Sequence, residues 1–172
     1  MKKVILIALF IFIGALVGCG KEPGELNNVS NISPDEIFNQ KEEKYYVYFH
    51  RIDCADCEES APYVINYAQI IKEYDECKDK RKIYAVLLFT SSEKPGQDTY
   101  IYREYTGEGG QGTDGKYFVD GLTNWEDLYI ASTSSLISVS ENNSGIKVSK
   151  YIAQGAEAVI EALNTQLGTC FQ

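Results

Sequence analysis

Two cysteines three positions apart, Cys54 and Cys57, are the residues of this 172-residue chain whose type and spacing point most directly to chemistry. Such a pair can form a disulfide, supply half of a metal site or consist of two ordinary thiols. At the start of a helix, free backbone N–H groups stabilise a thiolate on the first cysteine, and the second lies one turn on. This arrangement predicts Cys54 as an exposed nucleophile and Cys57 as the thiol that resolves a mixed disulfide.

The segments around the pair have the patterns that such a helix start requires. Residues 45–49 are β-branched and aromatic and predict a strand directly before the pair. Residues 58–77 carry apolar side chains at helical spacing, with a kink or a new start expected at Pro62. Residues 82–89 are almost continuously apolar, which is typical of a strand buried on both faces.

The rest of the chain predicts shorter elements around a long excursion. A helix start is expected at Ser33, with Pro34 at its first position. The other expected elements follow from periodicity and turn residues: an edge strand over 29–32, a short helix over 124–128, a hairpin over 135–140 and 146–152, and a closing helix over 156–167. The resulting order, β-α-β-α-β, an excursion and then β-β-α, predicts an α/β protein with a mixed sheet.

The N-terminus has the pattern of a secretory signal: two lysines, an apolar run over 4–17, a small residue and Cys19. The run is short for a spanning helix, although an uncleaved anchor is the alternative. Leu16-Val17-Gly18-Cys19 resembles the lipobox of bacterial lipoproteins, which implies that Cys19 is acylated and holds the mature chain on a membrane. We therefore expect a signal peptide over 1–18, a linker over 19–28, one domain over 29–172, and an extracytoplasmic location in a bacterial cell envelope.

The composition limits the partners and the state of the other cysteines. The formal net charge is −9, and it would become −11 on loss of Lys2 and Lys3 with the signal peptide. An acidic chain argues against nucleic acid partners and against lying flat on anionic lipid. Once Cys19 is set aside, four cysteines remain, and outside the cytoplasmic membrane an even count favours disulfides.

The order strand, Cys-x-x-Cys, helix, strand, hairpin and helix resembles the thioredoxin superfamily from about Val29 to Leu167. The resemblance implies a thioredoxin-like fold with helices flanking a central mixed sheet, a redox-active centre at Cys54 and Cys57, and an unusually long insertion after the central strand. Residues 130–137 stand where the family has its cis-proline loop and next strand, which implies a substrate groove at Thr133 and Ser134.

The same topology would bring the ends of the two main helices together. The resemblance thus implies a structural disulfide between Cys77 and Cys170, with two free thiols as the alternative.

The chain departs from the family pattern close to the pair. Ser134 replaces the proline, so we expect a trans peptide bond there. Asp53 replaces an aromatic residue, and residues 45–49 lack the family's buried acid. Four acids surround the pair: Asp53, Asp56, Glu58 and Glu59. Their negative charge disfavours a thiolate, although His50 and Arg51 could offset part of it. The net effect of these charges is a less acidic thiol at Cys54, which favours a reductant over an oxidant.

Other sites are less well supported by the sequence. A metal site built from Cys54, Cys57 and His50 would lack the second Cys-x-x-Cys of zinc ribbons, so no metal is expected. Glycine patterns within residues 107–116 approach two nucleotide-binding motifs without their required flanks, and no nucleotide or other cofactor is expected. The Gly- and Tyr-rich excursion over 90–121 is either a mobile loop or a lid over the pair; the lid would use Tyr100, Tyr102, Tyr105 and Tyr117.

The sequence thus predicts a membrane-anchored thiol-disulfide oxidoreductase whose partners are protein thiols and disulfides. The alternative is a binding or accessory lipoprotein on the same scaffold, with the excursion as its contact surface and no turnover. A structural, non-catalytic disulfide between Cys54 and Cys57 would fit that alternative.

Overall fold

The computed structural model of the chain describes residues 24–88, 119–128, 130 and 133–170. Five strands form one sheet in the order β1-β3-β2-β4-β5. Their bounds are β1 (Ser30–Asn31), β2 (Lys44–His50), β3 (Lys82–Leu87), β4 (Ser135–Glu141) and β5 (Lys147–Gln154). Strand β3 is parallel to β1 and β2, whereas β4 is antiparallel to β2 and β5. The predicted mixed α/β sheet is confirmed, and it is compatible with a thioredoxin-like fold.

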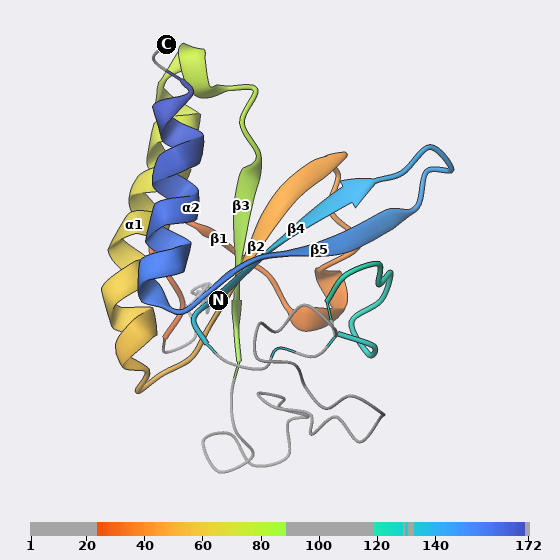
Figure 1. The fold of residues 1–172 in the computed structure, drawn as a ribbon, viewed down its shortest axis with the longest axis horizontal. Coiled ribbons are helices and arrows are strands. Elements are labelled where there is room, and N and C mark those ends of the chain that lie inside the picture. The colour runs from red at the N-terminus through yellow and green to blue at the C-terminus, as the bar shows by residue number, and fades with distance from the viewer. Residues whose placement is uncertain (1–23, 89–118, 129, 131–132, 171–172) are drawn as a thin grey trace, which may run out of the picture.

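Both α-helices, α1 (Ala55–Glu73) and α2 (Ala156–Gly168), lie side by side on one face of the sheet (Figure 1). The reason is the alternation along β2, which sends Tyr46 and Tyr48 to this face, where they pack with Val64 of α1 and Leu163 of α2. The closing helix agrees with its predicted range to within one residue. The Cys-x-x-Cys pair therefore sits where β2 leads into a helix that is fixed against the sheet.

The opposite face of the sheet is covered by irregular segments and not by α-helices in the described part of the chain. Tyr45, Val47 and Phe49 of β2 face this side and pack with residues from 119–130 and with Ile37. The helix expected at Ser33 is a single 3-10 turn, η1 (Pro34–Glu36). The helix expected over 124–128 is a turn, in which Asn124 Oδ1 accepts a hydrogen bond from the Asp127 amide at 3.0 Å. Both segments are too short to propagate a helix, so the described residues do not confirm a helical flank on this side of the sheet.

Helix α1 continues through Pro62 without interruption, contrary to the new start expected there. Proline removes one backbone hydrogen bond, and burial of Val64 and Tyr67, two and five residues farther on, stabilises the helix across that gap. The helix ends earlier than predicted, because Tyr74 adopts an extended conformation. Cys77 thus lies in a separate 3-10 turn, η2 (Asp75–Cys77).

A disulfide joins Cys77 to Cys170, the residue that follows the last turn of α2. Cys77 is fully buried and Cys170 nearly so. The two helices point the same way from the Cys54 end of the sheet, as Figure 1 shows, and this brings their far ends together. The disulfide fixes α2 to α1 at the end opposite the Cys-x-x-Cys pair.

Several predictions fall on residues outside the described ranges. They are the signal peptide and the acylated Cys19 within 1–23, and the Gly- and Tyr-rich excursion within 89–118. Of the helices that the structure describes, none has the length and apolar character needed to cross a membrane.

Candidate redox site

Cys54 and Cys57 form a disulfide with a Cα–Cα distance of 5.2 Å. Cys54 is the N-cap of α1, and its carbonyl accepts hydrogen bonds from the amides of Cys57 and Glu58. Its sulfur accepts from the Cys57 amide at 3.2 Å. An amide aimed at sulfur, together with the positive end of the helix dipole, stabilises negative charge on that sulfur once the disulfide is opened. The structure therefore gives Cys54 the environment of a reactive thiol.

Both cysteines are buried in the disulfide form, with 5 % of Cys54 and 4 % of Cys57 exposed. The prediction of an exposed nucleophile was wrong for this state. The first turn of α1 and the segment at Thr133 both contact the sulfur of Cys54, and no local sequence pattern predicts how closely that distant segment approaches.

A side-chain contact links Cys54 to a positive charge. The Thr133 hydroxyl lies 3.5 Å from the Cys54 sulfur, and Arg51 Nε donates a hydrogen bond to the same hydroxyl at 3.1 Å. A hydroxyl can accept a hydrogen bond from a guanidinium and also serve as a donor. Arg51 can thus act on Cys54 through Thr133. Arg51 was expected to offset nearby acids and Thr133 to line a substrate groove, and the structure places both in one chain of contacts with Cys54.

Thr133 contacts Cys54, and the peptide bond between Thr133 and Ser134 is cis. The expectation of a trans bond was wrong. That expectation was based only on the local preference for a trans peptide bond before a non-proline residue and did not include the tertiary contacts of the segment. The Ser134 carbonyl accepts a hydrogen bond from the Gly155 amide at 2.8 Å, which ties this segment to the start of α2. Gly155 has φ +85°, a conformation that suits glycine and disfavours other residues.

A tyrosine and a serine lie beneath the pair, and the sequence reading missed both. The Tyr48 hydroxyl lies 2.8 Å from Ser60 Oγ and 3.5 Å from the Cys57 carbonyl oxygen. Ser60 Oγ donates to the Asp56 carbonyl at 2.6 Å, so the tyrosine is the donor to Ser60. Burial raises the pKa of Tyr48, which keeps the phenol neutral. No carboxylate is buried in the described ranges, so the polar side-chain contact between β2 and the start of α1 is made by neutral hydroxyls.

His50 lies at the end of β2, is 3 % exposed, and stacks on the Tyr48 ring at a centroid distance of 5.5 Å. Within the described part of the protein, its Nε2 atom has no hydrogen-bond partner. Burial lowers the pKa of His50 to about 4. The imidazole is therefore neutral at neutral pH, and the suggestion that His50 offsets the nearby acids was wrong because the side chain is desolvated. Arg51 remains as the compensating charge.

This burial predicts a pH dependence of stability. Because the pKa of His50 is about 4 in the folded protein and 6.5 in the unfolded chain, only the unfolded chain takes up a proton as the pH falls through that window. The free energy of unfolding should fall by about 3 kcal/mol between pH 7.5 and pH 4 from this residue alone. Urea titrations at several pH values should show this loss of unfolding free energy in wild type and not in His50→Phe. If the free energies of unfolding of the two proteins changed in parallel with pH, the assignment to His50 would be contradicted.

The four acids near the pair, Asp53, Asp56, Glu58 and Glu59, are all exposed. Solvent and salt therefore weaken their effect on Cys54, although their sign still disfavours a thiolate. Asp53 has φ +55°, which turns the chain sharply between β2 and the N-cap of α1. Across residues 24–88, 119–128, 130 and 133–170, no group of three or more His, Cys, Asp or Glu side chains could hold a metal ion.

The contact chain from Arg51 to Cys54 predicts a graded effect on reactivity. Thr133→Val keeps the branched shape but removes the hydroxyl, and should slow thiol exchange at Cys54 about three- to tenfold, the effect of one ordinary hydrogen bond of about 1 kcal/mol. Arg51→Gln should act in the same direction, and the double variant should lose less than the product of the single effects. Stopped-flow alkylation of the reduced protein measures the rate, with Thr133→Ser as the control that keeps the hydroxyl. Additive effects would contradict the coupling.

No family model matches the chain, and a search of the curated proteins finds no match. The site itself has three features that bear on function: a disulfide at a helix start, a hydroxyl in contact with its first sulfur, and an arginine that donates a hydrogen bond to that hydroxyl.

Proposed function

We propose that this chain is a thiol-disulfide oxidoreductase of thioredoxin-like fold, held on the outer side of a bacterial membrane through a lipid on Cys19. The observation that carries the proposal is the Cys54–Cys57 disulfide at the N-terminus of α1, with the Cys54 sulfur in contact with a backbone amide and with Thr133. A disulfide with only a structural role needs neither the helix start nor the link to Arg51.

The reaction begins from the reduced pair. The Cys54 thiolate attacks one sulfur of a substrate disulfide, so that a Cys54–substrate bond forms, the substrate disulfide breaks, and the released thiolate takes a proton. Cys57 then loses its proton and attacks the Cys54 sulfur. The Cys54–Cys57 disulfide forms and the second substrate thiol leaves, so two electrons pass from the protein to the substrate. A protein or small-molecule dithiol must return the pair to its reduced form.

The direction proposed is reduction of the substrate. His50 is neutral, and the exposed acids around the pair disfavour the thiolate that a strong oxidant stabilises in its reduced form. A redox titration of the pair should give a potential below roughly −250 mV, whereas a value near −120 mV would indicate an oxidant.

The burial of both cysteines favours a second candidate, an accessory or binding lipoprotein in which the pair only braces the start of α1. Turnover separates the two. The full chain should reduce insulin disulfides with dithiothreitol as electron donor, and Cys54→Ser should show no activity above the rate of the donor alone. Cys77→Ser/Cys170→Ser is the matched control, because it removes two cysteines outside the site and should keep turnover at low temperature. Absence of Cys54-dependent turnover would leave the second candidate.

A further inference from the structure

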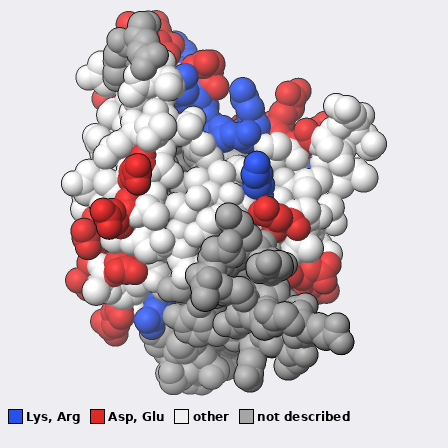
Figure 2. Space-filling model, in the orientation of Figure 1, with Lys and Arg blue, Asp and Glu red and all other residues white. Residues whose placement is uncertain are grey.

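A groove of about 640 Å3 lies at the end of the sheet opposite Cys54, where β2 and β3 begin and α1 ends. Glu42 is the single acid among the residues that line this groove. Five of the lining residues are lysines: Lys44, Lys72, Lys78, Lys80 and Lys82. The whole chain has a net charge of −9. Figure 2 shows Lys and Arg side chains gathered in the upper part of this view, with acids along the flanks. The tertiary structure thus concentrates positive charge in one hollow of an acidic protein.

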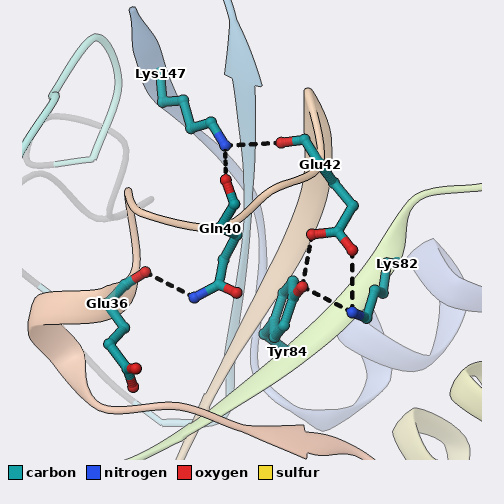
Figure 3. A network of polar contacts seen from close by, with 6 residues as sticks. All are labelled: Glu36, Gln40, Glu42, Lys82, Tyr84 and Lys147. Atoms are coloured by element: carbon teal, nitrogen blue, oxygen red, sulfur yellow. Dashed lines mark hydrogen bonds and ion pairs between the residues drawn. The ribbon is translucent and has the colours of Figure 1, made fainter.

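Glu42 does not neutralise this groove, because its carboxylate is already engaged (Figure 3). It accepts hydrogen bonds from Lys82 Nζ at 3.0 Å and from the Tyr84 hydroxyl at 2.6 Å. Burial acts to raise the pKa of the Glu42 carboxyl, but these two hydrogen bonds, together with a backbone hydrogen bond and the charge of Lys82, outweigh burial and lower it. The acid and Lys82 therefore form one compensated pair, which leaves four lysines.

The remaining lysines are weakly compensated. Lys78 pairs with Asp75 and Lys80 with Asp79, and both aspartates are largely exposed, so these pairs contribute little. Lys44 and Lys72 are exposed and form no ion pair with any residue of the described part. Ammonium groups held around one hollow repel each other, and an anion between them removes that repulsion.

The groove also has an apolar wall. Val29, Ala68, Ile71 and Ile83 line it beside the lysines. Its volume lies in the range of sites for organic ligands and far exceeds one small inorganic ion. An ammonium is a compact point charge that binds phosphate well. We propose that this groove binds a phosphate-bearing organic anion, with the lysines on the phosphate and the apolar wall on the carbon skeleton.

Two sources could present this chemistry: the headgroup of an anionic phospholipid, or a soluble phosphate ester. Asn28, which lines the groove, is nine residues after Cys19 in the sequence. A chain of nine residues spans at most about 30 Å. The lipid source therefore depends on the anchor proposed above, whereas the soluble source does not. Ala68, the groove residue of α1 that comes first along the helix, is 14 residues from Cys54, which is about 21 Å along the helix axis. A bound ligand would thus leave the redox site free, and a headgroup would orient that site away from the membrane.

Lysine footprinting by acetylation and mass spectrometry tests the proposal on the full chain in phosphatidylcholine vesicles. One arm adds glycerol 3-phosphate, and the other replaces part of the lipid by phosphatidylglycerol. Sodium chloride at equal ionic strength is the reference. Lys44 and Lys72 should be protected about tenfold once the ligand exceeds its Kd tenfold, while the exposed Lys150 outside the groove should react as before.

Protection by glycerol 3-phosphate identifies a soluble ester as a ligand, and protection by phosphatidylglycerol alone identifies the headgroup. In Lys44→Gln/Lys72→Gln, protection of Lys80 should fall, whereas Lys150→Gln should leave it unchanged. Insulin turnover should be the same in all these variants, so this test is separate from that of the proposed function. No protection in either arm, or equal protection by chloride or at Lys150, would overturn the proposal.

Discussion

Replacing Cys57 by serine should stop turnover and leave Cys54 joined to its substrate in a mixed disulfide. The Cα atoms of the pair are 5.2 Å apart, so the Cys57 sulfur is placed to attack Cys54 directly. An external thiol must replace that intramolecular attack in the variant, and positioned groups react as if present at very high concentration. Turnover should therefore fall at least about a hundredfold. Incubation with an oxidised peptide followed by intact mass spectrometry should show an adduct that dithiothreitol removes.

Cys54→Ser is the control for this trapping. It should form no adduct under the same conditions, because Cys57 lies inside the first turn of α1, whereas Cys54 is the N-cap with an amide directed at its sulfur. The backbone contacts of Cys54 persist in Cys57→Ser, so the variant should keep the circular dichroism spectrum of the wild type. An adduct on Cys57, or wild-type turnover in Cys57→Ser, would reverse the assigned roles.

Removing the second disulfide should have the largest effect on stability. Cys77 and Cys170 are 93 positions apart, so their bond greatly restricts the unfolded chain. Cys77→Ser/Cys170→Ser should lower the free energy of unfolding by somewhat over 4 kcal/mol on the chain-entropy model. The corresponding fall in Tm should be about 10 °C for a domain of this size. Urea titration and calorimetry of the oxidised proteins measure both quantities.

The matched control is Cys54→Ser/Cys57→Ser, which removes a disulfide that closes a far shorter loop. On the same model it should cost about 2 kcal/mol, roughly half as much. Equal effects of the two double variants, or no effect of Cys77→Ser/Cys170→Ser, would contradict a loop-length origin. Redox activity of Cys77→Ser/Cys170→Ser should persist below its lowered Tm, because that bond lies at the far end of α1 and α2.

Periodicity in the sequence was sufficient to place the elements that hold the pair. The aromatic run at 45–49 and the apolar run at 82–89 became neighbouring parallel strands, and the helical spacing after the pair became α1. Boundaries were less accurate where local signals conflicted. Pro62 predicted a break, but burial of Val64 and Tyr67 is a tertiary effect that favours one continuous helix. Ser33-Pro34 signals a helix start, but nothing after Glu36 extends it.

Contacts between distant residues could not be predicted from the sequence. Arg51 donates a hydrogen bond to Thr133, which is 82 positions away in the sequence, and the hydroxyls of Tyr48 in β2 and Ser60 in α1 are hydrogen-bonded to each other. No local pattern encodes such pairs, since they depend on how strands and loops stack. The neutral state of His50 has the same origin, because burial, and not its neighbours in the sequence, lowers its pKa.

Residue types and their spacing along the chain establish which chemistry is available to this protein: a Cys-x-x-Cys pair between a strand and a helix, acids around it, and a basic content too small to reverse the net charge. The tertiary structure sets where that chemistry acts. It buried the pair, connected Cys54 to Arg51 through Thr133, and gathered lysines from positions 44 to 82 into one groove. Residue type fixes which charges and nucleophiles exist, whereas their strength depends on burial and on distances that only the packed chain sets.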